Sequence, residues 1–491
     1  MRAGDRVQHA KHGPGRVLWM RSGGLFRVRF DHTQDLPRTV AREELELLSG
    51  SENGEAPSPE PEQPEQPEQP EQPERTERTV HTEQQVTLDP EPEEHLAIEV
   101  GDPQQRIERT QTIEALRLGV VPAHFVREYT VARDDELSSL DALLENRQGL
   151  RVIWGDYGHG KTHLLEMIER VALDRGFITA RITLDPAEVP ATHPKRLYRA
   201  VLAALHYHEG ARGLDPIMYR LLDSEEHREP GGKKFSRFLS PYLWALHRGD
   251  EELIGWVRDY ISGDNIDGQS LSNVLLRAGW KGQRALTLSD YRTYGRMYVH
   301  LLGTIASWAK DAGFPGLLLL FDEVEAVDQL SISRLEFARQ NLMHFAAVTV
   351  ETSHLGFDPR RELYKGGHEV HRRIPLRFAK DQPLGVVFAM TPLPDIETLF
   401  RELVPGQGLD VKLRSLQAKD LAELVRRIVL LYEQAYPGFV TTSAQRASLG
   451  ETMLDLREEG QSGVREIVRG TVLSLDGFRL GQPEKADDWI F

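Results

Sequence analysis

Residues 155–162 read Gly155-Asp156-Tyr157-Gly158-His159-Gly160-Lys161-Thr162, which follows the pattern G-x-x-x-x-G-K-[ST]. This stretch lies between the apolar run Arg151–Trp154 and a segment whose apolar residues have helical spacing. A glycine-rich loop in this position wraps its backbone N–H groups around phosphates at a helix N-terminus. In such a loop Lys161 reaches the β and γ phosphates, and the Thr162 hydroxyl joins the Mg²⁺ shell. The stretch therefore predicts a nucleotide-binding α/β domain.

A second sequence motif lies about 160 residues further on, where the apolar run Leu317–Phe321 ends in Asp322-Glu323. This pattern is typical of a buried central strand that delivers carboxylates to the ligand-binding edge of a parallel sheet. We expect Asp322 to hold Mg²⁺ and Glu323 to polarise the attacking water. Glu325 is a poorer candidate for the catalytic base than Glu323, because Glu323 directly follows the predicted metal ligand Asp322. The alternative is a strand followed by an acidic helix cap.

From about residue 105, helical segments alternate with short apolar runs, as in a parallel α/β domain. The candidate strands are Arg151–Trp154, Phe177–Leu184, Gly316–Phe321, Leu384–Met390 and Val411–Leu416. Residues 205–295 lack strand periodicity, and we interpret them as a helical insertion. The predicted nucleotide-binding core spans residues 105–410, and a helical lid with a C-terminal tail spans residues 411–491.

Two further positions favour an ATP hydrolase of the AAA+ type, in which a parallel sheet flanked by helices carries a helical lid. Thr391 follows the predicted strand Leu384–Met390, where a polar residue touches the γ-phosphate or water as a first sensor. Gly463-Val464-Arg465 matches the Gly-x-Arg pattern of a second sensor, which places Arg465 over the γ-phosphate. The alternative for Arg465 is an exposed residue of the lid surface.

Other arginines are weaker candidates for contact with the nucleotide. Residues 132–137, Ala-Arg-Asp-Asp-Glu-Leu, resemble the G-R-x-x-E-L opening of initiator-type AAA+ ATPases, with Ala132 in place of glycine. This resemblance places Arg133 among the nucleotide-binding residues. Arg401 lies after the first sensor and is the candidate for an arginine finger that acts on a neighbouring subunit. Arg334 and Arg339 are its rivals, and each of these arginines has a surface role as the alternative.

The composition narrows the class of protein. The chain has 491 residues and no cysteine, which excludes disulfides, thiolate nucleophiles and Cys-ligated metal centres. The beginning of the chain has no apolar signal core, and no run approaches about 18 apolar residues, so we expect a cytoplasmic protein without membrane association. The net charge is −16, but residues 51–94 carry −12 of it and residues 1–50 carry +3. The charge therefore does not exclude DNA as a partner.

The N-terminal residues predict a small β module followed by a linker. Residues 1–50 alternate short β-type runs with turn signals, which predicts an SH3-like barrel. The runs GDRVQHAKHGPGRVL and FRVRFD resemble the Tudor-like modules of UvrD/PcrA-type helicases and CarD-type regulators, which implies docking on a protein. The net charge of the module also permits contact with nucleic acid. Residues 51–104 repeat Pro-Glu-Gln four times from Pro61 to Gln72 and predict a disordered acidic linker.

A basic segment stands apart from these motifs. Residues 358–380 hold seven basic and three acidic side chains, with two histidines among them. Such a segment binds DNA phosphate in some proteins, and it is a solvated loop or an oligomer contact in others.

The region 105–480 resembles the BrxD-like ATP-binding proteins of BREX-type phage-exclusion systems. The resemblance rests on residues 155–165, 184–186, 197–199 and 317–327. It implies that the loop from Gly155 to His163, together with Arg133, binds ATP with Mg²⁺. It also implies a homo-oligomer in anti-phage defence, with a DNA helicase or translocase as partner. His159 departs from the family pattern, because small residues are common at its position.

These observations leave three functional hypotheses open. The first is an AAA+ ATPase that works as a switch or assembly factor in phage defence. The second is a DNA-binding ATPase of the initiator or helicase-loader type. The third is a scaffold that binds ATP and hydrolyses little of it. ATPase activity measured with and without DNA separates the three.

Overall fold

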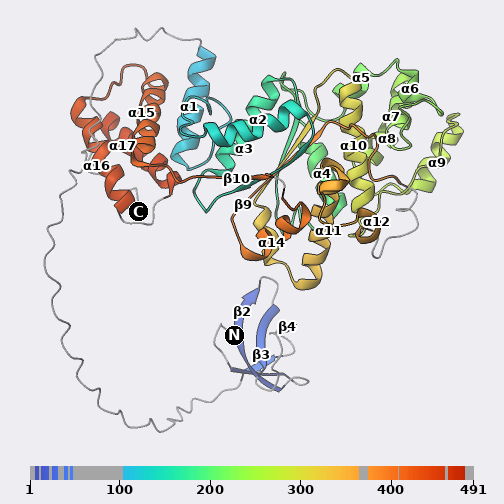
Figure 1. Cartoon of the computed structure of the whole chain (residues 1–491), viewed down its shortest axis with the longest axis horizontal. Coiled ribbons are helices and arrows are strands. Elements are labelled where there is room, and N and C mark those ends of the chain that lie inside the picture. The colour runs from blue at the N-terminus through green and yellow to red at the C-terminus, as the bar shows by residue number, and fades with distance from the viewer. Residues whose placement is uncertain are drawn as a thin grey trace. The chain divides into compact units, whose positions relative to one another are not determined.

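The computed structural model describes residues 6–9, 13–21, 25–30, 38–41, 45–47, 103–363, 374–406, 408–458 and 463–481. The chain divides into two compact units, Met1–Thr82 and Glu83–Phe491 (Figure 1). The predicted linker, residues 51–104, lies outside the described residues except for its last two.

The described part of the first unit is an antiparallel sheet. Its strands are β1 (Arg6–His9), β2 (Gly13–Arg21), β3 (Leu25–Phe30), β4 (Arg38–Ala41) and β5 (Leu45–Leu47). Their order is β4-β3-β2-β1-β5, so β4 and β5 are the two edges and no pairing among the described residues joins them. Closure into a barrel and a relation to Tudor-like modules therefore stay predictions.

The second unit is built on a five-stranded parallel sheet. Its strands are β6 (Gly149–Trp154), β7 (Ile178–Thr183), β8 (Leu317–Asp322), β9 (Leu384–Met390) and β10 (Asp410–Lys412), in the order β10-β6-β9-β8-β7. The α/β fold with a parallel sheet is thus confirmed. The last strand is shorter than the predicted Val411–Leu416, because its partner β6 ends at Trp154, which pairs with Lys412.

Helices cover both faces of this sheet, and the alternation of side chains in β8 explains why. Leu318 and Leu320 point to a layer formed by α2 (Asp134–Asn146) and α3 (Lys161–Asp174). Leu317, Leu319 and Phe321 point to the opposite layer. That layer contains α4 (Pro194–Ala204), α10 (Gly295–Asp311), α11 (Ile332–Thr349) and α14 (Pro394–Leu403). Every residue of β8 and β9 is buried, as expected for strands covered on both faces.

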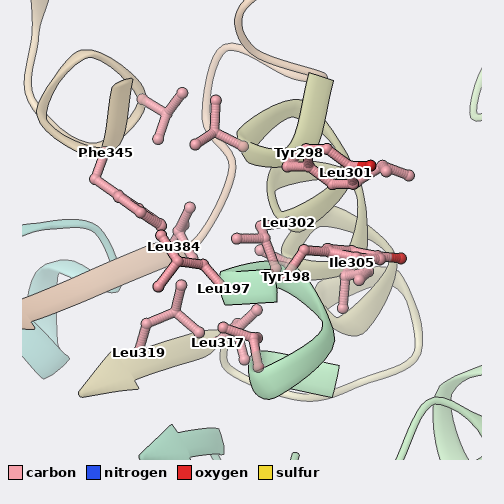
Figure 2. Close-up of a cluster of buried hydrophobic side chains, with 14 of the residues drawn as sticks. Leu197, Tyr198, Tyr298, Leu301, Leu302, Ile305, Leu317, Leu319, Phe345 and Leu384 are labelled. Carbon is pink, nitrogen blue, oxygen red and sulfur yellow. The ribbon is translucent and has the colours of Figure 1, made fainter. Parts of the chain in front are cut away.

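The larger core lies between the sheet and α4, α10 and α11. Figure 2 shows Leu197 and Tyr198 of α4 packed with Tyr298, Leu301, Leu302 and Ile305 of α10 above Leu317 and Leu319. The predicted helical insertion extends this core. Its helices are α5 (Asp215–Arg220), α6 (Glu225–Arg228), α7 (Ser240–Arg248), α8 (Glu251–Ile261) and α9 (Gly268–Arg277).

A second core belongs to the lid. Three lid helices, α15 (Ala418–Ala435), α16 (Ser443–Glu458) and α17 (Val464–Leu480), follow the sheet. The helix α1 (Pro103–Arg117), from the other end of the unit, packs against both α15 and α17 (Figure 1). Arg117 binds Asp476 of α17 at 2.6 Å (Nε to Oδ2), and the Tyr432 hydroxyl donates to the same carboxylate at 2.6 Å. The chain before the phosphate loop thus helps to build the lid.

Three shorter helical elements lie among the connections of the second unit. The 3₁₀ segments are η2 (Val324–Gln329) and η3 (Thr352–His354), and α12 (Pro359–Glu362) is a single helical turn. Among the described residues, we find no helix with the length and apolar character needed to span a membrane.

Candidate nucleotide-binding site

The glycine-rich loop has the backbone that its sequence predicts. It joins the end of β6 to α3, which begins at Lys161. Gly158 and Gly160 have φ angles of 79° and 93°, in the left-handed region that favours glycine. A β-carbon on Gly158 would lie 3.4 Å from the Gly463 Cα, so the lid approaches the loop closely here. The loop therefore presents the N-terminus of α3, where backbone N–H groups bind anions.

Lys161 lies at the base of the loop and is almost completely buried. Its Nζ donates to the Gly155 carbonyl at 3.0 Å and to the Thr391 hydroxyl at 2.9 Å. Thr391 directly follows β9, which lies between β6 and β8 in the sheet. The structure thus brings together two predicted site residues that are 230 positions apart.

Thr162 and Asp322 form a pair of oxygen groups beside Lys161. The Thr162 hydroxyl donates to Asp322 Oδ2 at 2.8 Å, and the Glu323 backbone N–H donates to Oδ1 at 3.0 Å. Asp322 is 4% exposed at the end of β8. Hydroxyl and carboxylate oxygens are the hard ligands that Mg²⁺ prefers, so these two residues fit a Mg²⁺ site.

Glu323 is accessible to solvent and lines the same pocket as Lys161 and Thr162. Its φ of 56° is left-handed, and the chain turns there into η2. Partial burial raises the pKa of the Glu323 carboxyl, and the negative charges of Glu325 and Asp322 raise this pKa further. A carboxylate with a raised pKa is a stronger base, which suits the predicted role of Glu323.

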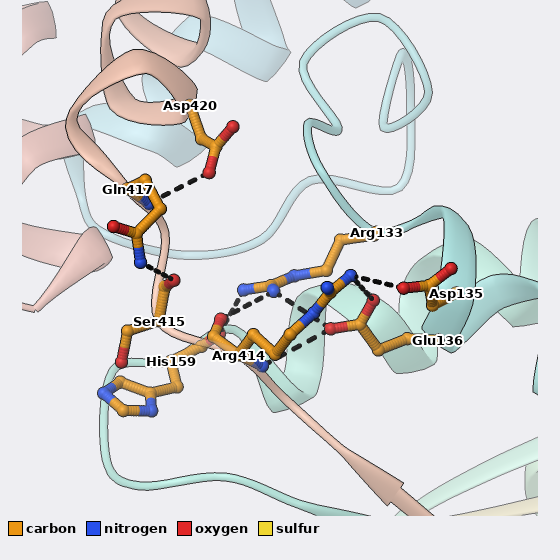
Figure 3. Close-up of polar contacts among 8 residues, drawn as sticks. All are labelled: Arg133, Asp135, Glu136, His159, Arg414, Ser415, Gln417 and Asp420. Carbon is orange, nitrogen blue, oxygen red and sulfur yellow. Dashed lines mark hydrogen bonds and ion pairs between the residues drawn. The ribbon is translucent and has the colours of Figure 1, made fainter.

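Arg133 lies behind the loop, and its guanidinium contacts protein groups from three segments (Figure 3). It donates to the His159 carbonyl of the loop at 3.1 Å and to the Arg414 carbonyl after β10 at 2.8 Å. It also pairs with Glu136 of α2 at 3.3 Å. Arg133 also lines the pocket, but these contacts tie the loop to the segment that leads into the lid.

His163 follows Thr162 and lies against Tyr129. Burial, with Arg133 nearby, lowers the pKa of His163 to about 4, so its ring is neutral at pH 7. The Thr130 hydroxyl donates to the Val126 carbonyl at 2.6 Å and lies 2.8 Å from His163 Nε2. The hydroxyl proton is used in the first bond, so His163 Nε2–H is the donor of the second.

The rest of the pocket is an apolar wall that sequence reasoning missed. It is lined by Leu116, Val120, Val121, Tyr129, Val131, Leu416, Leu424, Val464 and Val468. These residues come from α1, from the segment before α2 and from the lid. Ligand pockets are generally lined by apolar groups with a few polar ones. The flat nucleobase of a nucleotide fits against such an apolar wall when its phosphates lie in the adjacent loop. The residues are distributed along the chain from Leu116 to Val468, and no local spacing relates them.

Arg465 reaches the pocket from the start of α17. Its Nη1 donates to the Tyr157 hydroxyl at 2.7 Å, and its guanidinium lies 5.2 Å from the Tyr157 ring centroid. A β-carbon on Gly119 would lie 3.2 Å from Arg465 Cγ, so the backbone after α1 packs against this side chain. In this structure the partner of Arg465 is thus the exposed tyrosine of the loop.

The arginine-finger candidates lie outside this pocket. Arg401 of α14 has a side chain that is 74% exposed and pairs with Glu397 at 3.8 Å. It lines a separate groove with Asp156 and His159 of the loop. Arg334 is exposed on α11, and Arg339 pairs with Glu402 at 3.4 Å.

Only part of the basic segment 358–380 falls in the described residues. Arg377 donates to the carbonyls of Ala347 and Val350 at the end of α11, a structural contact. Arg360 and Arg361 are exposed on α12. Lys365, His368, His371, Arg372 and Arg373 lie outside the described residues.

The parallel sheet, the glycine-rich loop and the carboxylates at the end of β8 together define a P-loop nucleotide-binding protein. Residues 105–349 match the sequence model of the family described as BREX system ATP-binding protein BrxC/D. The match supports an ATP-binding role for this chain in BREX phage defence. It covers Lys161, Thr162 and Asp322 and ends before Thr391, Arg401 and Arg465. No curated protein matches the chain.

Proposed function

We propose that this chain is a Mg²⁺-dependent ATPase of the AAA+ type that acts as a switch or assembly factor in BREX phage defence. The observation that carries this proposal is one pocket lined by Lys161, Thr162, Glu323 and an apolar wall, with Asp322 hydrogen-bonded to Thr162. This arrangement supports an ATP hydrolase whose phosphate-binding and carboxylate groups all belong to one chain.

Each residue of the site has a separate role in the proposed hydrolysis of ATP. Lys161 leaves the Gly155 carbonyl and binds the β and γ phosphate oxygens. Thr162 and Asp322 hold Mg²⁺, which neutralises negative charge on the phosphates when it is bound. Glu323 accepts a proton from the attacking water, a task that its raised pKa favours.

The charge of the transition state needs an additional cation. Arg465 is within the pocket, and an exposed arginine such as Arg401 serves a neighbouring subunit in a homo-oligomer. An arginine finger is worth about 10³–10⁵ in rate in GTPases. A DNA helicase or translocase as partner, DNA contact, and docking of a protein on the N-terminal module are parts of the same proposal.

One observation favours a second function, an ATP-binding scaffold with little hydrolysis. Arg465 is bound to the Tyr157 hydroxyl, and Lys161 is bound to a loop carbonyl and to Thr391. Both cations must change partners before they reach a terminal phosphate. If that change does not occur, ATP is bound and not hydrolysed.

Steady-state ATPase rates and ATP titrations of two variants test the proposal. Lys161→Ala removes the phosphate-binding ammonium and abolishes ATP binding, while Glu323→Gln binds ATP without turnover. Lys310→Ala, an exposed lysine at the end of α10, is the matched control and retains the wild-type rate. Unchanged hydrolysis in both site variants overturns the assignment. Binding without hydrolysis in the wild type supports the scaffold instead.

A further inference from the structure

Glu325 occupies a position beside the phosphate site that its place in the sequence does not suggest. The left-handed turn at Glu323 leads into η2, and the Ala326 N–H donates to the Glu323 carbonyl at 3.0 Å. This tight turn directs the side chain of Glu325 to the end of β9. Its carboxylate Oε1 accepts the Thr391 hydroxyl proton at 2.5 Å and lies 3.6 Å from Lys161 Nζ.

The hydrogen bonds of Thr391 define the direction of its hydroxyl. A hydroxyl has one proton, and here Glu325 accepts it. The Thr391 oxygen therefore accepts the bond from Lys161 Nζ at 2.9 Å. In this arrangement Thr391 is a bridge between a carboxylate and an ammonium, and it has no proton left for a phosphate.

A purely structural role explains Glu325 poorly. Its side chain is 17% exposed, and Oε2 is buried without a hydrogen-bond partner among the described residues. A buried carboxylate oxygen without a partner costs stability, so a fold that needed only a packing residue would be more stable without it. A negative charge is instead kept beside the ammonium that binds phosphate.

We infer that Glu325 is a positioning residue that acts through Thr391 to place the Lys161 ammonium, and that its carboxylate competes with the terminal phosphate for that ammonium. This inference deepens the proposed function and rests on it. The carboxylate holds Lys161 in place before the nucleotide arrives and releases it to the nucleotide.

A double-variant cycle of Glu325→Gln and Thr391→Val tests the inference. Glu325→Gln lowers kcat between about tenfold and 100-fold, because Lys161 loses its fixed position. The same variant binds ATP about threefold or more tightly, because a negative charge beside the phosphates is gone. The double variant has a kcat within about threefold of the poorer single variant, because the two residues act as one unit. Thr391→Ser recovers most of the loss caused by Thr391→Val.

Controls separate this role from packing and from the proposed function. Glu336→Gln, which removes an exposed carboxylate on α11, leaves kcat and ATP affinity unchanged. Weaker ATP binding together with a lower melting temperature in Glu325→Gln overturns the inference, and so do kcat losses that multiply in the double variant. If the wild type hydrolyses no ATP, the proposed function fails. In that case the double-variant cycle is measured on ATP affinity alone. Additive effects of the two substitutions on the free energy of ATP binding then overturn the inference.

Discussion

The contacts of Arg133 predict a large and specific loss of stability when this residue is replaced. Arg133→Met keeps most of the volume and removes the charge. The side chains of Arg133 and Glu136 are 6% and 3% exposed, so the variant leaves a buried carboxylate without its main partner. It also leaves the His159 and Arg414 carbonyls without the guanidinium donor. The change affects α2, the loop and the entry to the lid together.

The size of the stability loss in Arg133→Met depends on the groups that remain around Glu136. Removal of one partner of a buried ion pair costs about 3–5 kcal/mol. The Arg414 side chain remains 3.8 Å from Glu136, but it is 65% exposed, so it offsets little of the loss. We therefore expect the free energy of unfolding to fall by about 3 kcal/mol. ATP affinity falls as well, because the His159 carbonyl is no longer held.

Urea unfolding followed by circular dichroism measures the loss, with the slope of the transition checked for a change in cooperativity. Arg133→Met/Glu136→Met, which removes both charges, recovers a large part of the stability. Arg414→Met serves as the matched control, because it removes only an exposed charge. A loss below about 1 kcal/mol in Arg133→Met, or no recovery in the double variant, would refute the reasoning.

Two further predictions follow from other groups. Burial lowers the pKa of His300 to about 4, below its unfolded value of 6.5, so the unfolded state binds more protons between these values. Stability therefore falls by about 3 kcal/mol as the pH drops through this window, and His300→Phe reduces the fall in urea unfolding at pH 7 and pH 4.5. An equal fall in both proteins would contradict this assignment. Tyr157→Phe removes the acceptor of Arg465 and keeps the ring, so ATP binds up to about fivefold more tightly in equilibrium titrations. A weaker affinity would mean that the tyrosine itself contributes to nucleotide binding.

Sequence patterns predicted the parts of this protein that depend on local spacing. The phosphate loop is recognisable because left-handed glycines and a lysine at a helix start must occur at fixed offsets. The strand that ends in Asp322 and the strand that precedes Thr391 are recognisable because a strand covered on both faces is a continuous apolar run. The place of Glu325 beside Lys161 does not follow from its distance in sequence to Asp322, because that distance carries no information about a turn with positive φ at Glu323.

The class of domain, the phosphate loop and the carboxylates at the end of β8 follow from the amino-acid sequence, because those features need only neighbouring residues. The tertiary structure alone decided which distant groups meet. Arg133 bonds to a carbonyl 281 positions away, Lys161 bonds to Thr391, and α1 joins the lid. Such contacts depend on how two separate cores pack around the pocket. The residues of the apolar wall and the partners of each buried charge therefore follow from packing, which has no local signature in the chain.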